Sequence, residues 1–294
     1  MTSLIGIVTV LFNSDDVLPG FFKSLAEQEG VVYKLYVIDN SKTDSGSRIS
    51  RQLANRYGID VEIVFNDANF GVAKGNNQGI ELARHDGCDY ILLSNNDIEF
   101  DNKNLFAGLV QELNDRQLDA VVPKIYYFGL DRKIWFAGGD FSKFRAITPH
   151  WGDGEDDRGQ FDAISIVNYA PTCFVLMRAN VFDAIGLMDE KYFVYFDDAD
   201  FMWRMKSAAM RLGMAPSFNL WHKVSFSTGG QASDFTLYYG FRNRIYFIRK
   251  NFNNFWAAVS VAFVLATVVA RCVVYKKKSQ KIALLKGFRD GFFL

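Results

Sequence analysis

Several common signatures are missing from this chain of 294 residues. No G-x-G-x-x-G follows the first apolar run and no G-x-x-x-x-G-K-[ST] occurs anywhere, which disfavours a dinucleotide-binding dehydrogenase and a P-loop NTPase. The three cysteines, Cys88, Cys173 and Cys272, are too widely spaced to form a metal-type pair and suggest a reducing compartment. Met1 to Ser3 leads into a strand-like run without a basic segment, so we expect no signal peptide.

The net charge is also zero, but the charges are unevenly distributed. From residue 235 to the end, eleven lysines and arginines face one acid, Asp290, so this part carries +10 and the rest carries −10. The pattern favours an acidic catalytic body with a basic tail that meets an anionic partner. Hydrophobic residues make up 49% of the chain, which is enough for a substantial core in one large domain or two small ones.

The first hundred residues alternate between apolar runs and helix-like segments. We expect strands at 4–12, 34–38, 61–65 and 90–93, with helices at 17–29, 47–57 and 72–84 between them. This order predicts an α/β fold: a doubly wound, mostly parallel central sheet with helices on both faces. Polar residues follow each strand, at 13–14, 39–41, 66–67 and 95–97. Since parallel strands end at one edge of a sheet, these residues predict a binding cleft there.

The fourth of these strands ends in Ser94-Asn95-Asn96-Asp97. An acidic residue with small polar neighbours suits Mg²⁺ or Mn²⁺ carrying phosphate oxygens. A plain turn is the alternative, because the same residues favour turns. A glycine-rich segment at 69–79 also follows a strand and opens a helix, where its amides and Lys74 would face a phosphate or ribose. Glycines placed for close packing are the alternative there.

Three carboxylates, Asp197, Asp198 and Asp200, lie within four residues after an aromatic run. Carboxylates this close repel one another, and apolar neighbours raise their pKa further, so the cluster indicates a functional site. The alternative is that Asp197 or Asp198 caps a helix expected at 201–212. For Asp200 we expect a surface ion pair with Arg204, four residues along that helix.

Taken in order, the motifs resemble family 2 glycosyltransferases of the GT-A fold (the nucleotide-diphospho-sugar transferase fold), in particular a bacterial rhamnosyltransferase-like branch. The matching stretches are 7–14 (IVTVLFNS), 37–44 (VIDNSKTD), 69–77 (NFGVAKGNN), 92–97 (LLSNND), 174–178 (FVLMR), 185–190 (IGLMDE), 195–204 (YFDDADFMWR), 221–222 (WH) and 238–243 (YYGFRN). They cover about residues 4 to 250. The resemblance implies a domain at 1–250, with a nucleotide-binding half at 1–100 and an acceptor-binding half at 101–250, followed by membrane-association helices at 251–294.

The resemblance also implies an activity: inverting transfer of a sugar from a nucleoside diphosphate donor to a lipid-linked or cell-surface glycan acceptor. We expect dTDP-rhamnose first and a UDP-sugar second as donor, and a polyprenyl-linked acceptor. Asp198 would be the general base, because it matches the second acid of the family's Glu-Asp pair, and Asp197 replaces the Glu. Asp97 and His222 would hold Mg²⁺ or Mn²⁺, although Asn95 replaces the first acid of the usual Asp-x-Asp. For His222, a satisfied core histidine is the alternative.

The remaining residues that the resemblance assigns would bind the nucleotide-sugar. Asp39 would accept a hydrogen bond from N3–H of a uracil or thymine, with Thr9 beside the base. Arg242 and Asn243 would contact the phosphate or a lipid-linked acceptor. The rest of the expected donor site is Asn13, Asn69, Lys74, Asn76, Asn96 and Asp197. The charged loop at 142–164 is expected to overhang the cleft and select the acceptor.

The tail predicts contact with a membrane. Residues 255–270 carry no charge, but this run is shorter than the roughly 20 residues of a confident span. Basic residues on both flanks favour a helix on the anionic cytoplasmic face of the bacterial inner membrane, peripheral or shallowly inserted, and 281–294 reads as an interfacial helix. The alternative is a dimerisation helix, with a homo-oligomer as the consequence.

Two other functions fit parts of the sequence pattern. A sugar nucleotidylyltransferase shares the style of fold, but its glycine- and arginine-rich first loop is absent after Phe12. A non-catalytic, nucleotide-sugar-binding scaffold in a glycan assembly complex would tolerate loss of Asp97 and Asp198, and both are present. We expect no nucleic acid partner.

Overall fold

Alternating strands and helices build the first hundred residues, as the sequence predicts. A computed structural model describes residues 3–223 and 233–294, so Met1 and Thr2, used above for the signal-peptide expectation, lie outside the described residues. The first elements are β1 (Leu4–Leu11), α1 (Leu18–Ala26), β2 (Val32–Asp39), α2 (Ser45–Tyr57), β3 (Val61–Phe65), α3 (Val72–His85) and β4 (Tyr90–Ser94). Each boundary lies within about three residues of its predicted place, the usual error of such predictions.

The second half completes the sheet and adds a helical layer. It contains β5 (Ile98–Glu99), α4 (Leu105–Asp115), β6 (Ala120–Tyr127), β7 (Ile134–Phe136), β8 (Ile166–Val167), β9 (Phe174–Arg178), α5 (Val181–Ile185), a 3₁₀ turn at Glu190–Tyr192, α6 (Asp197–Ser207), β10 (Leu212–His222), α7 (Asp234–Asn251), α8 (Asn254–Val274) and α9 (Lys278–Asp290). The described strands form one sheet in the order β3-β2-β1-β4-β9-β6-β10-β5.

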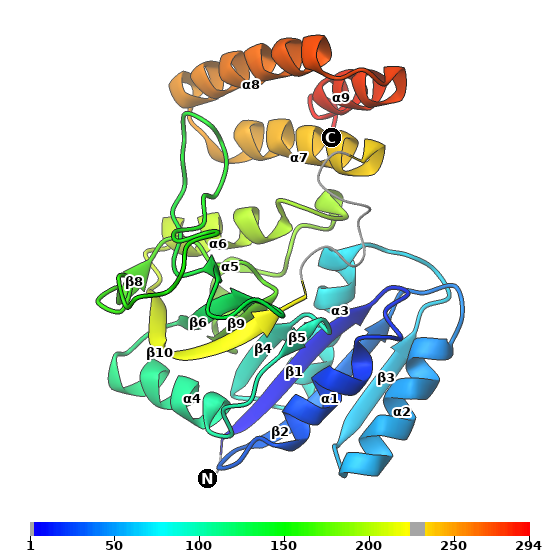
Figure 1. The fold of residues 1–294 in the computed structure, drawn as a ribbon, viewed down its shortest axis with the longest axis vertical. Helices are drawn as coiled ribbons and strands as arrows, with labels where there is room; N and C mark the ends of the chain where they lie inside the picture. The colour runs from blue at the N-terminus through cyan, green and yellow to red at the C-terminus, as the bar shows by residue number, and fades with distance from the viewer. Residues whose placement is uncertain (1–2, 224–232) are drawn as a thin grey trace.

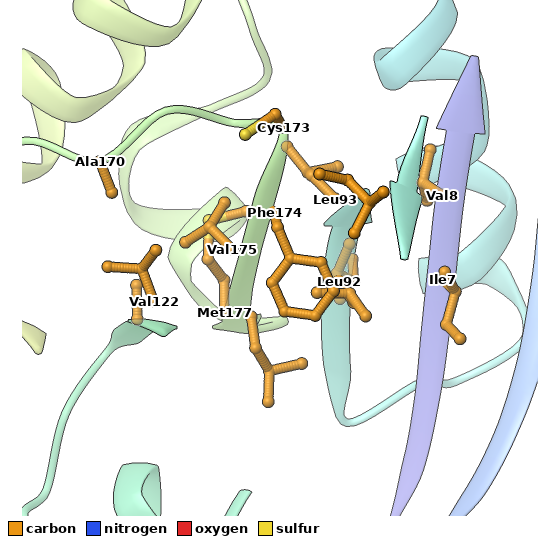
Figure 2. Close-up of a cluster of buried hydrophobic side chains, with 14 of the residues drawn as sticks. Ile7, Val8, Leu92, Leu93, Val122, Ala170, Cys173, Phe174, Val175 and Met177 are labelled. Carbon is orange, nitrogen blue, oxygen red and sulfur yellow. The ribbon is translucent and has the colours of Figure 1, made fainter. Parts of the chain in front are cut away.

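The sheet is mostly parallel, and this prediction is confirmed. β1, β2, β3 and β4 pair in parallel, as do β6 and β10, whereas β9 runs antiparallel between β4 and β6. Figure 2 shows the core at this junction, where Phe174 and Val175 of β9 lie beside Leu92 and Leu93 of β4. These side chains are almost fully buried, so the antiparallel strand joins the two halves through one continuous apolar core.

Helices cover both faces of β1 because its side chains alternate between the faces. On one face, Val8 and Val10 meet α3, and on the other Leu11 meets Gly46 of α2. The approach of α3 is very close: a Cβ on Gly79 would lie 2.3 Å from Cγ1 of Val8, and one on Gly75 would lie 2.8 Å from both γ carbons of Val10. The close-packing alternative therefore holds for Gly75 and Gly79.

The C-terminal helices form a separate layer beyond the sheet (Figure 1). Their own buried cluster contains Leu237, Phe241, Ile245 and Ile248 of α7, Val264 and Val268 of α8, and Leu284 of α9. α7 also sends Tyr246 and Phe247 into the main core, so it joins the layer to the sheet. The division predicted at residue 250 falls at the end of this shared helix and stays a prediction.

Helix α8 is longer than the uncharged run predicted, with 21 residues. It is long and apolar enough, by length and composition, to cross a membrane. One face packs on the layer through Ser260, Val264 and Val268, while Val273 is 80% and Val274 73% exposed. Arg271 is exposed near the end of α8, and its guanidinium lies 5.3 Å from the Phe241 ring of α7.

The loop at 142–164 contains no helix or strand, yet it is packed. Its first part reaches α8 (Figure 1), where the Ser260 hydroxyl donates to the carbonyl of Lys143 and the ring of Phe144 lies 4.7 Å from that of Phe263. Its middle part is held by Asp157, which accepts hydrogen bonds from buried Lys124 and Tyr126 of β6. The loop thus spans from the C-terminal layer to the sheet.

The two packing environments of helical glycines predict opposite effects of one methyl group. Gly79→Ala should lower the free energy of unfolding by about 1–3 kcal/mol, because the new Cβ overlaps Val8. Gly240→Ala, where nothing lies within 4 Å of the new Cβ, should raise it by about 0.5–1 kcal/mol through helix propensity. Urea unfolding in mild detergent measures both; equal effects would contradict the packing of α3 on β1.

Candidate active site

Polar residues from all four strand ends meet at one edge of the sheet, as predicted. The backbone N–H of Asn13 donates to Ser41 Oγ, and Asn66 Nδ2 donates to Asn40 Oδ1. Asn96 Nδ2 donates to the carbonyl of Val10. Beside this network lies a cavity of about 340 Å³ lined by Val10, Phe12, Ser14, Asn40, Asn69, Gly71, Val72, Asn76, Asn95, Asn96, Asp97, Phe193, Val194, Tyr195, His222 and Phe235. This size and mixed lining are typical of a small-ligand site.

The two predicted metal ligands, Asp97 and His222, lie close together on the cavity wall. Asp97 follows β4 and His222 ends β10, and the register of β10 with β5 places His222 opposite Ile98. Asp97 Oδ1 lies 3.2 Å from His222 Nε2, but the two atoms are not aligned as a hydrogen bond. Within the described part of the chain, buried Asp97 Oδ1 and His222 Nδ1 have no hydrogen-bond partner. An oxygen and an imidazole left in this way fit a divalent cation.

The predicted base-binding residue Asp39 is enclosed. Its side chain is 0% exposed, and its oxygens accept hydrogen bonds from the backbone N–H of Ser41 and from both the N–H and the hydroxyl of Ser47. Asp39 thereby fixes the turn after β2. Thr9 is also fully buried, and neither residue lines the cavity. Asn13, with a φ of 51°, lies between lining residues Phe12 and Ser14 without lining the cavity itself.

The glycine-rich segment reaches the cavity through part of its residues. Asn69 and Asn76 line it, whereas the Lys74 ammonium lies 4.5 Å from the Phe70 ring. Gly71 has a φ of 85°, and a Cβ there would lie 2.4 Å from the carbonyl oxygen of Phe193. Glycine is therefore required at 71 both for its backbone conformation and for this close approach.

The segment Phe193–Phe196, which precedes the carboxylate cluster, has a strained backbone. Phe193, Tyr195 and Phe196 have φ of 59°, 64° and 65°. Bulky residues rarely adopt such angles, and each costs on the order of 1–3 kcal/mol. The segment persists because it is bonded on two sides: Val72 N–H donates to Phe193 O over 2.6 Å, and α7 binds several of its carbonyls. Strain of this kind is common at functional sites.

The expectation of a helix at 201–212 was wrong: α6 covers 197–207, and Leu212 already belongs to β10. Asp197 and Asp198 are therefore in the first helical turn, with Phe196 at the N-cap and no side-chain capping bond. The positive end of the helix dipole favours acids there. Asp198 Oδ2 accepts from the Tyr169 hydroxyl over 2.6 Å, and its Oδ1 accepts from the N–H of Ala199.

Burial raises the pKa of both acids. For Asp197, desolvation and then repulsion from Asp198 raise the pKa to about 7. For Asp198, desolvation raises the pKa, and the hydrogen bond from Tyr169 opposes the increase. Since the two carboxylates repel each other, the pair loses its protons in two steps. The arrangement supplies one carboxylate with raised basicity, held in a fixed direction.

The ion pair of Asp200 with Arg204 is confirmed, but its predicted surface position was wrong. Asp200 is 0% exposed, and Lys250 of α7 binds the same carboxylate over 2.9 Å. Lys250 also binds Asp189, so one cation joins α6 to the segment before the 3₁₀ turn. A helix-surface pattern predicted the i, i+4 pair correctly, but it contained no information about α7 packing across it.

Arg242 lies away from the cavity. Its guanidinium donates to the carbonyls of Lys191 and Tyr192 and lies 4.7 Å from the Tyr239 ring. Tyr169 and Asn243 lie where the sequence did not place them. Tyr169 lies in a stretch without a motif, so no signal in the sequence could have indicated it. Asn243, expected with Arg242 to contact the phosphate or the acceptor, is buried and does not line the cavity.

Comparison with known proteins identifies the family of the chain. The family model described as glycosyl transferase family 2 matches residues 6–186. A low-salt glycan biosynthesis hexosyltransferase, Agl10 of Haloferax volcanii, is 21% identical over 250 residues, covering 82% of this chain and 74% of its own. An N-acetylglucosaminyl-diphospho-decaprenol L-rhamnosyltransferase of Mycobacterium tuberculosis is 23% identical over 246 residues, covering 78% and 79%.

Solved structures share the fold. Residues 1–349 of TarS from S. aureus, in complex with UDP-GlcNAc, superpose with a TM-score of 0.66 at 12% identity, covering 98% of this chain and 80% of that one. The mannosyltransferase PcManGT from Pyrobaculum calidifontis, in complex with GDP-Man and Mn²⁺, gives a TM-score of 0.62 at 11% identity, covering 99% and 87%. These likenesses and the sheet confirm the predicted GT-A-type α/β fold.

Proposed function

The chain belongs to glycosyl transferase family 2, and from that premise we propose that it transfers a sugar from a nucleoside diphosphate to a glycan acceptor with inversion, using Asp198 as general base. The observation that carries the proposal is the Asp97–His222 pair on the cavity wall, because buried Asp97 Oδ1, 3.2 Å from His222 Nε2, has no hydrogen-bond partner among residues 3–223 and 233–294. A cavity with such a pair fits a cation-bound diphosphate better than an apolar ligand.

Asp97 and His222 would hold Mg²⁺ or Mn²⁺, and the bound cation would offset the charge of the diphosphate leaving group. Across the described ranges, no third His, Cys, Asp or Glu joins them in a metal-type cluster. Diphosphate oxygens and water would therefore complete the coordination, which is common for Mg²⁺ sites on phosphates. Asn95, in place of the first acid of Asp-x-Asp, leaves one carboxylate on this wall.

Asp198 would take the proton of the acceptor hydroxyl as that oxygen attacks the anomeric carbon. The new C–O bond forms while the bond to the diphosphate breaks on the opposite face, and the nucleoside diphosphate leaves with the electron pair. Tyr169 holds one carboxylate oxygen and Ala199 N–H the other, so the group is oriented before the acceptor arrives. Asp197, with its pKa near 7, limits the negative charge of the pair.

The proposed donor and acceptor are supported by one relative. One relative is named as an L-rhamnosyltransferase acting on a decaprenol-diphosphate-linked sugar. We therefore place dTDP-rhamnose first and a UDP-sugar second as donor, and a polyprenyl-linked glycan as acceptor. Asp39 and Thr9 would lie behind the nucleobase, and the donor would have to reach Asp39 by displacing an internal hydrogen bond from Ser41 or Ser47.

The acceptor would be met at a membrane surface. The exposed apolar side of α8 continues into Lys276, Lys277 and Lys278, which are all exposed. A helix with one face on protein and the other apolar, followed by lysines, fits an in-plane position on an anionic leaflet, the cytoplasmic face of the bacterial inner membrane. The alternative, α8 as a dimer interface, would bury the same face against a second copy.

Substituting Asp198 and Asp97 in turn should separate a loss of chemistry from a loss of cation-dependent binding. Asp198→Asn should lower kcat by about 10²–10⁴-fold while a nucleotide-sugar still raises the melting temperature. Asp97→Ala should abolish the part of that rise that depends on Mn²⁺. The assays are sugar transfer to a polyprenyl-diphosphate-linked N-acetylglucosamine and thermal shift with dTDP- and UDP-sugars.

Asp183→Asn, which removes an exposed acid of α5, is the matched control and should behave as wild type. If no nucleotide-sugar raises the melting temperature of the wild type, the donor cavity is contradicted. Binding without transfer to any acceptor would favour the scaffold.

The hydroxyl of Tyr169 should set the acid limb of the pH–rate profile. Asp198 acts only when ionised, so kcat/KM falls as the pH drops through its pKa, which burial has raised. The hydrogen bond from Tyr169 lowers that pKa, so Tyr169→Phe should move the acid limb to higher pH. Tyr90→Phe, which removes a hydroxyl bonded to Asn114, should leave the limb in place. An unmoved limb in Tyr169→Phe would argue against Asp198 as the base.

Vesicle binding tests the membrane surface. Lys276→Gln, Lys277→Gln and Lys278→Gln together should weaken binding to anionic vesicles by about 100-fold, since each lysine contributes about 1 kcal/mol. Val273→Glu should weaken binding through the apolar side. Lys103→Gln, a lysine on the sheet domain, is the control. The in-plane position would be contradicted if the protein bound neutral vesicles in high salt as strongly as anionic ones. A stable dimer that does not bind vesicles would contradict it as well.

A further inference from the structure

We infer that Asn243 is a positioning residue for Asp198: its side-chain amide holds the strained segment that joins the cavity wall to the carboxylate. The inference rests on the proposed function, since it gives Asn243 a part in sugar transfer. Asn243 lies in the middle of α7 and is 0% exposed. It touches neither the cavity nor Asp198, so it would act only through the segment.

One amide nitrogen contacts three backbone carbonyls within four residues. Asn243 Nδ2 lies 2.8, 2.7 and 2.9 Å from the carbonyl oxygens of Tyr192, Val194 and Tyr195, which share its two N–H donors. The orientation of the amide is determined by its neighbour, because Arg242 Nε can only donate and lies 2.8 Å from Asn243 Oδ1. The oxygen thus faces the guanidinium and the nitrogen faces the carbonyls, and all four contacts agree on this assignment.

The segment needs such a clamp because its backbone is unfavourable. Three residues between 193 and 196 hold positive φ, and an unclamped chain would relax to ordinary angles. Left-handed residues also turn their carbonyls away from regular partners. Asn243 donates to the carbonyl of left-handed Tyr195 and to that of its neighbour Val194.

Displacing the segment would move two parts of the site together. Phe193, Val194 and Tyr195 line the cavity, and Asp197 follows directly after Phe196 as the first residue of α6. The opposite side of the segment is fixed on Gly71 and Val72. Asn243 therefore sets the distance between the donor cavity and the Asp198 carboxylate, and misplacement of reacting groups by about 1 Å costs roughly 10²-fold in rate.

The test replaces the hydrogen-bond donor of Asn243, its Nδ2 group, without changing the shape of the side chain. Asn243→Asp puts a carboxylate oxygen against three carbonyls and keeps the contact with Arg242, whereas Asn243→Ala removes the group. Either variant should lower kcat by about 100-fold, a larger factor than the change in donor affinity. Hydrogen exchange of peptides covering 192–198 should become about ten-fold faster, while exchange in β1 and β4 stays as in wild type.

A matched control separates positioning from stability. Leu284→Ala truncates a fully buried residue of α9 in the same helical layer, without contact to the segment. It should lose a similar part of the stability and keep a kcat close to wild type. If Leu284→Ala, at equal melting temperature, loses as much kcat as Asn243→Ala, or if exchange at 192–198 is unchanged in both Asn243 variants, the inference is overturned.

The two proposals fail in different ways. A wild type that transfers no sugar from any donor would contradict the proposed function. Hydrogen exchange needs no substrate, so it would still decide whether Asn243 holds the segment. Faster exchange combined with an unchanged kcat would overturn the positioning role and leave the proposed function intact.

Discussion

The contact between Phe193 and Gly71 is the constraint on which the site depends. Two segments more than a hundred residues apart approach so closely that the carbonyl of Phe193 occupies the place of a Cβ on Gly71. The first segment opens α3 at the edge of the parallel sheet, and the second opens α6 with its carboxylates. Helix α3 packs closely on β1 at Gly75 and Gly79, so the position of the strained segment depends on β1. Precision at the carboxylates thus comes from close backbone packing.

The sequence predicted this architecture where the pattern is local. β1, α3 and the polar strand ends follow from periodicity and from the rule that parallel strands share an edge, and both were confirmed. Asp97 and His222 were paired by resemblance, and the sheet register brings them to 3.2 Å. What failed was long-range: the burial of Asp200 and the start of α6 depend on α7, which packs across them, and no spacing along the chain contains that contact.

Tyr169 is another residue whose part in the site could not be predicted from the sequence. A single hydroxyl from a segment without secondary structure orients Asp198, and its neighbours in the sequence, Asn168 and Ala170, carry no recognisable chemistry. His150 stacks on the Tyr169 ring, and Trp135 touches both His150 and His222 edge-on at 4.6 Å. A row of aromatic rings therefore runs from His222 to Tyr169, whose hydroxyl binds Asp198. Its members come from β7, β10, the 142–164 loop and the segment before β9, so only the folded chain reveals it.

The basic tail serves two purposes that net charge alone could not separate. Arg242 and Lys250 bind carbonyls and carboxylates of the sheet domain, and Arg244 donates to the carbonyl of Arg145 while burial lowers its pKa to about 10. These cations attach the helical layer to the catalytic body. Lys276, Lys277 and Lys278 are exposed after α8, and they provide the charge that would meet a membrane. Part of the predicted basic charge of the tail is therefore used for contacts within the protein, and only the rest faces outward.

The short set of cation ligands has a thermodynamic consequence for the proposed reaction. One carboxylate and one imidazole bind Mg²⁺ or Mn²⁺ weakly by themselves, because these ions need about six ligands and most would be water. A donor diphosphate adds anionic oxygens to the same cation, so each raises the affinity of the cavity for the other by the same factor. Asn95 in place of an acid would then make the cavity dependent on the donor for its cation. A product diphosphate that leaves would take this support away, which favours release of both together.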